Sequence, residues 1–434
     1  MLNFKDEICE CGKRHICTVD EYVISAGAVK KLPEYIKKYN AKKAFVLADV
    51  NTYAAAGGAV CGLLAENQIA YSEYVFPQKA LEPDEHSVGS AVMHFDNSCD
   101  IIVTVGSGVL NDISKILATV TDKPYIIVAT APSMDGYASN SSSMARDGLK
   151  ISLPSKCPNV ISGDIDILKT APDHMAKSGL GDMLAKYISI CEWRISNLIN
   201  GEYYCEKVAE LVRTALKKCV DNADGLLKKD SDAIAAVFEG LIISGNAMEY
   251  AGISRPASGG EHYISHVWDM RGLSFGTKVD MHGIQCAVAT RYTVKIYEQI
   301  KKLVPDLAKA RGYAESFDTE DWNRQLREFV GLGAEAMIAI EKKEQKYNVQ
   351  KHSERIKLIA DNWDKILGII EEEIPSLEEI DRILDTVNAP KSASEIGIDE
   401  AIVPMTFKAS KDIRDKYVLP RLAWDLGVID ELKF

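Results

Sequence analysis

The stretch Ile101-Ile102-Val103-Thr104-Val105-Gly106-Ser107-Gly108 decides the fold class of this 434-residue chain. Its first five residues are all β-branched and form a nearly continuous apolar run, which is typical of a strand covered on both faces of a sheet. A Gly-Ser-Gly turn follows, and residues 109–119 then have helical periodicity. Strand, turn and helix in this order predict a βαβ unit and a parallel sheet.

The same alternation extends in both directions from this stretch, over about the first 170 residues. Further strands are predicted at residues 19–25, 44–48, 71–76 and 125–128, and further helices at 29–39, 53–67 and 84–95. From Lys177 onward strand signals almost vanish, and helices are predicted at 178–191, 203–217, 232–250, 283–303, 320–348 and 354–373. We therefore predict two domains: a Rossmann-like α/β domain with a parallel sheet, residues 1–170, and an all-α domain, residues 171–434.

Composition and charge exclude several classes of protein. Hydrophobic residues make up 47% and charged residues 26% of the chain, which is ordinary for a globular protein and excludes a disordered or fibrous one. The net charge of -12 leaves no long-range basic field for nucleic acid or an anionic membrane. The start, Met1 to Glu7, does not have the pattern of a signal peptide, and ten cysteines are too few for a disulfide scaffold. We therefore expect a cytoplasmic protein with reduced thiols.

Residues that suit a bound dinucleotide follow three of the predicted strands. Gly106, Ser107 and Gly108 let the backbone approach a pyrophosphate, and the helix that begins near Val109 presents unpaired N–H groups to it. Asp49 follows the strand at 44–48 and can accept the ribose hydroxyls of NAD. Residues 130–139, small and polar, follow another strand and favour a site loop. The structural alternatives are a plain βα turn, a helix N-cap at Asp49 and a simple connector.

One aspartate and three of the eight histidines form a second candidate site. Asp182 lies near the start of the first helix predicted for the second domain. His262 and His266 are four residues apart, which puts them on one face of a helix, and His282 follows. One carboxylate and two imidazoles are a recurrent ligand set for a divalent metal, with positions left open for a substrate. The alternative is a pair of helical histidines that bind no metal.

A third pattern lies at the start of the chain, where Cys9-Glu10-Cys11-Gly12-Lys13-Arg14-His15-Ile16-Cys17 combines thiols with an imidazole. Cys9, Cys11, His15 and Cys17 are suitable ligands for a structural zinc ion. No second cluster of this kind follows in the sequence, so ordinary reduced thiols remain the alternative.

Together these residues resemble the iron-containing alcohol dehydrogenase superfamily, which also contains glycerol dehydrogenases and dehydroquinate synthases. Within it, the chain most resembles the bacterial sn-glycerol-1-phosphate dehydrogenases, through residues 130–143, 179–186 and 258–283 and through the opening from Cys9 to His15. The resemblance implies a dehydroquinate synthase-like architecture with a divalent metal between the two domains. It also implies NAD(P)-dependent interconversion of dihydroxyacetone phosphate and sn-glycerol 1-phosphate, a reaction of phospholipid biosynthesis.

By motif, the resemblance implies a role for each candidate residue. The implied metal ligands are Asp182, His262 and His282. The implied substrate contacts are Asp135, Asp182 and His266, and the last two are also implied to be catalytic. The implied dinucleotide contacts are Asp49, Gly106, Ser107, Gly108, Val109, Leu110, Thr130, Ser133 and Ser139. Ser107 departs from the glycine common in relatives. Lys186 stands four residues after Asp182, where alcohol dehydrogenases with four ligands have a histidine, which favours zinc or nickel over iron.

Other functions stay open on the sequence alone. They are a phosphate-eliminating lyase of the dehydroquinate synthase type, a glycerol or other polyol dehydrogenase without phosphate recognition, and a nucleotide-binding protein without turnover. The sequence does not locate the substrate phosphate, for which the candidates are Arg146, Lys150, Arg255 and Arg271, each more often a solvated surface charge. The acidic segment beyond Glu320 carries no motif, and a homo-oligomer is an open expectation.

Overall fold

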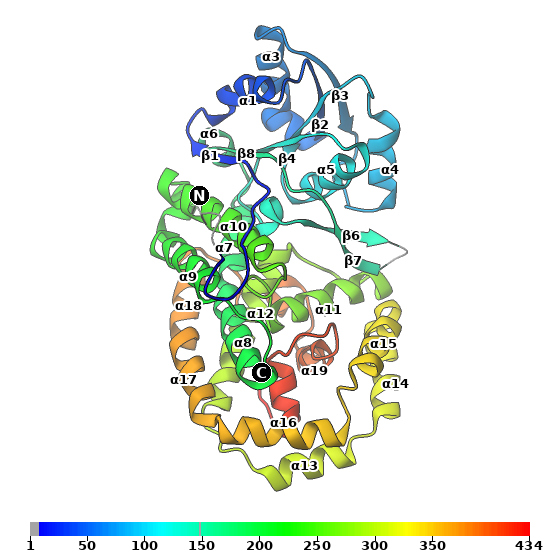
Figure 1. Ribbon diagram of the computed structural model, residues 1–434, viewed down its shortest axis with the longest axis vertical. Helices are drawn as coiled ribbons and strands as arrows, with labels where there is room; N and C mark the ends of the chain where they lie inside the picture. The colour runs from blue at the N-terminus through cyan, green and yellow to red at the C-terminus, as the bar shows by residue number, and fades with distance from the viewer. Residues whose placement is uncertain (1–7, 147–148) are drawn as a thin grey trace. The chain divides into compact units, whose positions relative to one another are not determined.

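The computed structural model describes residues 8–146 and 149–434 (Figure 1). Its contacts divide the chain into two compact units: unit 1 comprises Met1–Met183 and Glu210–Ile253, and unit 2 comprises Leu184–Ala209 and Ser254–Phe434. Our domain division between residues 170 and 171 stays a prediction. The prediction that the chain starts without a signal peptide falls on residues 1–7, which lie outside the described residues.

Unit 1 is built on a six-stranded sheet in which every neighbouring pair of strands is parallel. In chain order the strands are β1 (Glu21–Ser25), β2 (Lys43–Asp49), β3 (Ala70–Phe76), β4 (Ile101–Gly106), β5 (Tyr125–Ala129) and β8 (Val160–Asp164). Their order across the sheet is β1-β8-β5-β4-β2-β3, and every residue of β4 and β5 is buried. The predicted parallel sheet is therefore confirmed.

Helices of unit 1 pack with apolar side chains, as α5 shows. The helices of unit 1 include α1 (Leu32–Lys38), α2 (Val50–Thr52), α3 (Gly58–Glu66), α4 (Glu85–His94), α5 (Gly108–Thr121), α6 (Ile165–Leu168) and α10 (Ser231–Ala251), with α7 (Asp173–Leu184) ending at the boundary. In α5, Leu110, Ile113 and Leu117 are buried at spacings of three and four residues, which is the helical period of a core-facing side.

Two elements of unit 1, β8 and a β-hairpin, were not predicted from the sequence. β8 lies between β1 and β5 and contains Gly163. A Cβ atom at Gly163 would lie 2.3 Å from the ring of Phe238, so glycine allows α10 to pack closely against the sheet. The hairpin consists of β6 (Ser141–Arg146) and β7 (Leu149–Pro154), which pair antiparallel.

Unit 2 is helical. Its helices are α8 (Lys186–Asn200), α11 (Gly260–Phe275), α12 (His282–Ile300), α13 (Leu307–Ser316), α14 (Thr319–Val330), α15 (Ala334–Glu344), α16 (Val349–Asp361), α17 (Trp363–Glu373), α18 (Leu377–Thr386), α19 (Val403–Ser410) and α20 (Leu419–Asp425). α9 (Glu206–Asp221) begins in unit 2 and continues into unit 1. No helix among the described residues is long and apolar enough to cross a membrane.

Three helices predicted as single elements are each interrupted. The one at 178–191 is divided between α7 and α8 at Ala185, and the one at 354–373 is divided between α16 and α17 at Asn362. The one at 320–348 is broken at Gly331, whose φ of 75° ends α14 in a conformation that favours glycine. Periodicity alone missed these breaks because apolar spacing continues across each of them.

Candidate functional site

The Gly-Ser-Gly turn lies where β4 passes into α5. β4 ends at Gly106, and α5 begins at Gly108 with Ser107 as its N-cap, whose side chain makes no capping hydrogen bond. A Cβ at Gly106 would lie 2.5 Å from the Leu110 side chain, so only glycine fits this close turn. The Thr130 amide donates to the Gly106 carbonyl over 3.0 Å, which places the start of the second predicted loop beside the turn. The amides at the start of α5 are thus available to an anion.

The loop at 130–139 is held by two polar side chains of α5 that were not among the predicted site residues. The buried Lys115 ammonium donates to the carbonyl oxygens of Gly136 (3.0 Å) and Ser141 (2.5 Å) and to the Ser139 hydroxyl (3.2 Å). The Asn111 amide donates to the same Gly136 carbonyl over 3.0 Å. Asn111 and Lys115 are four residues apart on the buried face of a predicted helix, and that spacing is the signal that could have found them.

Asp135 and Asp182 meet within unit 1. The Asp135 amide donates to Asp182 Oδ2 over 2.9 Å, and Asp135 Oδ2 accepts a 2.8 Å hydrogen bond from the Ser244 hydroxyl. Asp182 is fully buried in α7, and Ser244 lies on α10. Both aspartates predicted to serve the substrate or the metal are therefore brought together, and Ser244, absent from the predicted set, orients one of them.

Asp49 has the capping role that was the structural alternative for it. Its Oδ1 accepts hydrogen bonds from the amides of Asn51 and Thr52, each over 2.8 Å, while the Thr52 hydroxyl accepts one from the Asp49 amide. This capping box fixes the side chain at the carboxyl end of β2. A role for Asp49 at a ribose stays a prediction.

In unit 2, His262 is oriented by the residue before it. Its ring Nδ1 lies 2.7 Å from Glu261 Oε1, and Glu261 Oε1 also accepts from the Gly259 amide over 2.9 Å. Since a carboxylate only accepts, Nδ1 carries the proton and Nε2 is left with its lone pair. Both side chains are buried. A carboxylate bonded to the distal nitrogen of a histidine is the arrangement that orients metal-ligating imidazoles in proteins.

The other two histidines lie beside His262. His262 and His266 both lie on α11, with ring centroids 6.4 Å apart, and His282 begins α12, with its centroid 4.9 Å from that of His262. The predicted helical pairing of His262 and His266 is confirmed. Ligand atoms of His262, His282 and Cys286 all lie within 4.8 Å of one another. Burial by itself raises the pKa of the Cys286 thiol, but the two histidines outweigh burial and lower it overall.

A second buried carboxylate, Glu192 on α8, supports the start of α11. Its two oxygens accept from the amides of Gly260 (2.8 Å) and Leu419 (2.7 Å). Burial, reinforced by the nearby charge of Glu261, raises the pKa of Glu192 to about 8. This role could not be predicted from the sequence because Glu192 lies far from the histidines along the chain.

The donor chemistry of these residues fits a divalent metal. The tautomer of His262 is fixed with the lone pair on Nε2, and the ring of His282 is adjacent. Lys186 occupies the position where the family resemblance places a fourth ligand in iron enzymes. Its Nζ donates instead to the Ala257 carbonyl over 3.0 Å. Asp182 lies in unit 1 and the two histidines in unit 2, so their joint ligation of one metal stays a prediction.

Two of the cations suggested for the substrate phosphate have protein partners. Arg255 donates to both carboxylate oxygens of Glu202, over 2.8 and 2.6 Å. Arg271 donates to the Phe329 carbonyl and lies 4.2 Å above the Phe329 ring. Arg146 is exposed on β6 and Lys150 lies on β7.

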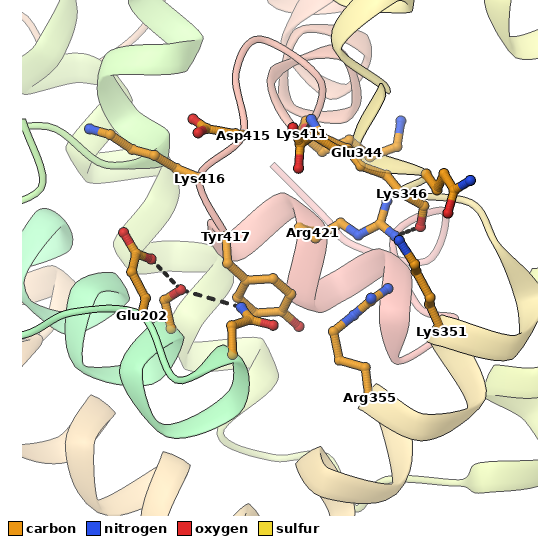
Figure 2. A pocket seen from close by; sticks show the side chains of 13 residues that line it. Glu202, Glu344, Lys346, Lys351, Arg355, Lys411, Asp415, Lys416, Tyr417 and Arg421 are labelled. Atoms are coloured by element: carbon orange, nitrogen blue, oxygen red, sulfur yellow. Dashed lines mark hydrogen bonds between the residues drawn. The ribbon is translucent and has the colours of Figure 1, made fainter. Parts of the chain in front are cut away.

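A cavity of about 400 Å³ in unit 2 lies apart from the predicted site residues, none of which lines it (Figure 2). Its charged lining residues are Glu202, Glu344, Lys346, Lys351, Arg355, Lys411, Asp415, Lys416 and Arg421. Several of these cations already have partners: Arg355 donates to both oxygens of Asp425, and Lys411 lies 3.3 Å from Asp412. We assign this cavity no part in the reaction.

Comparison with known proteins defines the class to which this fold and these residues belong. Residues 23–172 match the family described as iron-containing alcohol dehydrogenase. The solved structure of a glycerol dehydrogenase from Schizosaccharomyces pombe is similar, with a TM-score of 0.56 and 19% sequence identity over 94% of this chain and 96% of that one. At that identity the likeness shows the fold alone, which is the fold predicted from the sequence.

The chain belongs, within this class, to the glycerol-1-phosphate dehydrogenase family. It is 34% identical over 296 residues to a Bacillus licheniformis protein named glycerol-1-phosphate dehydrogenase, NAD(P)+, a match that covers 67% of this chain and 74% of the relative. A protein of the same name from Halalkalibacterium halodurans is 29% identical over 415 residues, covering 95% of this chain and 94% of the relative. The family resemblance seen in the sequence is thereby confirmed.

Proposed function

We propose that this chain is a metal-dependent oxidoreductase that interconverts dihydroxyacetone phosphate and sn-glycerol 1-phosphate with NAD(H) or NADP(H). The observation that carries the proposal is the buried Glu261–His262 pair beside His282, an arrangement suited to binding a metal, in a chain that belongs to the glycerol-1-phosphate dehydrogenase family. The names of these relatives favour this reaction over the lyase, polyol dehydrogenase and non-enzymatic alternatives.

The dinucleotide is proposed to bind at the carboxyl ends of the strands of unit 1. Uncapped amides at the start of α5, from Gly108 to Leu110, hold the pyrophosphate, and Asp49 meets the adenosine ribose. Thr130, Ser133 and Ser139 belong to the adjoining loop, which the Lys115 ammonium keeps in place. An acidic residue at position 49 repels a 2′-phosphate, so we expect a preference for NAD over NADP.

Asp182, His262 and His282 are proposed to hold zinc or nickel. A divalent cation bound there supplies Lewis-acid charge to the C2 oxygen of the substrate, and the dinucleotide supplies the hydride. The roles of the side chains follow from their hydrogen bonds. Glu261 keeps the proton on Nδ1 of His262.

His266 is proposed to pass the proton between the C2 oxygen of the substrate and solvent. Its ring lies next to that of His282, 5.8 Å between centroids, and Asp269 Oδ2 lies 4.0 Å from Nδ1. Asp135, fixed by the Ser244 hydroxyl, orients the substrate. We further propose that the enzyme works in the cytoplasm, in phospholipid biosynthesis.

A steady-state assay tests this function. Metal-replete protein should oxidise NADH with dihydroxyacetone phosphate, much more slowly with dihydroxyacetone, and not without a ketone. His282→Ala should abolish metal-dependent turnover, while Asn67→Ala, an exposed residue at the end of α3, should retain it. Absence of activity with the phosphorylated ketone, or an active His282→Ala protein without metal, would refute the proposal.

A further inference from the structure

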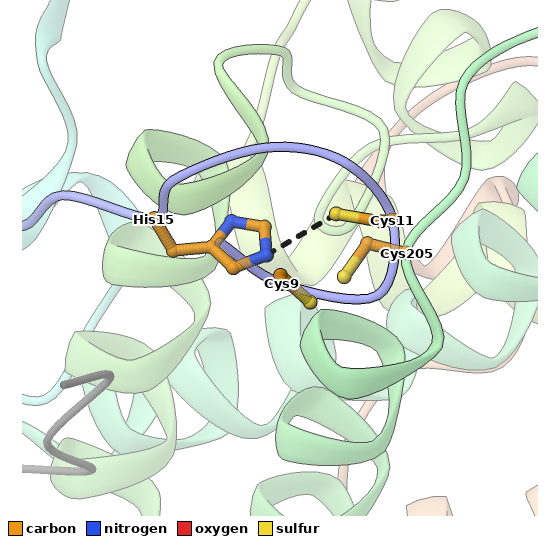
Figure 3. A group of neighbouring side chains, drawn as sticks. All are labelled: Cys9, Cys11, His15 and Cys205. Atoms are coloured by element: carbon orange, nitrogen blue, oxygen red, sulfur yellow. Dashed lines mark hydrogen bonds between the residues drawn. The ribbon is translucent and has the colours of Figure 1, made fainter. Parts of the chain in front are cut away.

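The N-terminal segment before β1 brings together thiols and an imidazole that the proposed reaction does not use. Ligand atoms of Cys9, Cys11, His15 and Cys205 all lie within 4.8 Å of one another (Figure 3). His15 Nε2 lies 3.4 Å from Cys11 Sγ. In a tetrahedral zinc site with bonds of about 2.3 Å to sulfur and 2.0–2.1 Å to nitrogen, neighbouring ligand atoms are roughly 3.5–3.8 Å apart. The cluster therefore requires only small side-chain adjustments to surround one ion.

The imidazole is oriented as a metal ligand should be. His15 Nδ1 lies 2.8 Å from the Tyr250 carbonyl oxygen. A carbonyl oxygen only accepts, so Nδ1 carries the proton and Nε2, the nitrogen beside the sulfur atoms, has the lone pair. His15 is 6% exposed, so its orientation is set by the protein rather than by solvent. Protein partners of this kind fix the tautomer of histidines that bind zinc.

The backbone forms a tight turn that brings the first two thiols together. The Gly12 amide donates to the Cys9 carbonyl over 2.8 Å, and the Cys9 amide donates to the Lys13 carbonyl over 2.9 Å. Gly12 has a φ of 82°, a conformation that favours glycine and closes the turn between Cys11 and His15. Cys205 immediately precedes α9, and its carbonyl accepts a 3.0 Å hydrogen bond from the Ala209 amide.

Cys17, which the sequence suggested as the fourth ligand, is engaged elsewhere. Its thiol donates to Asn246 Oδ1 over 3.3 Å, and its sulfur is not one of the four ligand atoms that lie within 4.8 Å of one another. The structure therefore replaces Cys17 with Cys205, which the sequence could not indicate from a distance of almost two hundred residues.

We propose that Cys9, Cys11, His15 and Cys205 bind a structural zinc ion, separate from the metal of the catalytic site. Three sulfur ligands and one imidazole are a common set for closed, tetrahedral zinc sites, and no position remains for a substrate. Binding converts the thiols to thiolates and releases their protons to solvent, so zinc affinity falls at low pH. This site does not depend on the proposed reaction.

Zinc analysis of the full-length protein tests the site. In a His282→Ala background, which removes the catalytic metal, we expect one tightly bound zinc per chain. Cys205→Ser should lose that zinc, whereas the matched control Cys17→Ser, a cysteine of the same segment outside the cluster, should retain it. A His282→Ala protein without zinc, or zinc that is unaffected by Cys205→Ser, would overturn the proposal.

Two measurements on the His282→Ala protein, which retains Cys205, keep the test decisive if Cys205→Ser fails to fold. A mercurial reagent, which competes for thiolates, should release the zinc to a chromogenic chelator. Cobalt substituted for zinc should give the intense sulfur-to-cobalt charge-transfer absorption of a thiolate site, and the His262–His282–Cys286 group cannot supply it because His282 has been removed. Cobalt bound without that absorption, or a disulfide found among the three cysteines, would contradict the proposal.

Discussion

Gly179→Ala is the most informative single change for the contact between α7 and the loop at 130–139. A Cβ atom at residue 179 would lie 2.0 Å from the Pro132 carbonyl oxygen and 2.9 Å from its carbon. Carbon and oxygen in contact are normally about 3.3–3.6 Å apart, so α7 and the loop must separate by roughly 1.3 Å. Both carry proposed site residues: α7 carries Asp182, and the loop carries Asp135, whose amide donates to Asp182.

The expected loss falls on catalysis more than on stability. Overpacking of this kind costs about 1–3 kcal/mol of unfolding free energy, which a chain of this size survives. A misplacement of about 1 Å at a catalytic contact costs on the order of 100-fold in rate. We therefore expect kcat/KM for NADH oxidation with dihydroxyacetone phosphate to fall by about two orders of magnitude in a folded protein.

Gly62→Ala is the matched control. Gly62 is exposed on α3, and a Cβ there would have no neighbour within 4 Å. The same substitution should therefore stabilise the protein slightly, by up to about 1 kcal/mol, through helix propensity and leave activity unchanged. Circular dichroism and thermal unfolding monitor folding of both variants. A folded Gly179→Ala protein with the kcat/KM of the unsubstituted chain would refute the reasoning that this contact positions the two aspartates.

Three further predictions concern buried charges. Lys115→Met should lower the free energy of unfolding by about 3–5 kcal/mol, measured by denaturant titration, because it removes the buried cation that lies 2.9 Å from the half-buried Asp112 carboxylate and that donates to the Gly136 and Ser141 carbonyls. Glu192→Gln should lower the free energy of unfolding by about 1–3 kcal/mol and weaken metal retention. The NH₂ group of the new glutamine would face the amide of Gly260 or Leu419, and two donors cannot form a hydrogen bond. Unchanged metal content would contradict this prediction. Burial lowers the pKa of Lys411 to about 7, whereas the unfolded chain keeps the ordinary, higher lysine pKa. Between pH 7 and 10 the unfolded chain therefore binds more protons than the folded chain, and the free energy of unfolding should rise with pH over this range. Lys411→Met should reduce that rise, as thermal unfolding across the range would show.

The order of strands and helices in unit 1 could be predicted because the apolar runs are short and separated by turns. β8 escaped because Val160-Ile161-Ser162-Gly163-Asp164 has only two large apolar residues, and its burial depends on the neighbouring strands and on Phe238. In the helical unit, breaks at Ala185 and Asn362 escaped because neither residue is a strong helix breaker. Local sequence carries periodicity, whereas burial and helix breaks depend on tertiary contacts.

The candidate site likewise contains residues that local sequence indicates and residues that only tertiary contacts reveal. Glycines and histidines that lie close to one another in sequence were proposed from their spacing, and the aspartates were proposed from their positions along the chain and from the family resemblance. Ser244 and Glu192, which hold such residues in place, were not predicted because they come from distant parts of the chain, and Lys115 was not predicted although it lies on the helix that follows the Gly-Ser-Gly turn. Polar residues on predicted helices are usually solvated, and only the structure shows that these three are buried. Cys205 is a similar case, since a lone cysteine carries no signal until the fold sets it beside Cys9 and Cys11.

Two glycines that precede Glu261 and His262 leave room for the Glu192 carboxylate at the start of α11. Gly259 and Gly260 allow the Glu192 carboxylate to approach the backbone closely. A Cβ at Gly259 would lie 2.6 Å from Glu192 Oε2, and one at Gly260 would lie 2.9 Å from Oε1. Alanine at either position would push the carboxylate away from the start of α11. The glycines thus let a buried carboxylate cap the helix that carries His262, so the position of a proposed metal ligand depends on residues that never touch the metal.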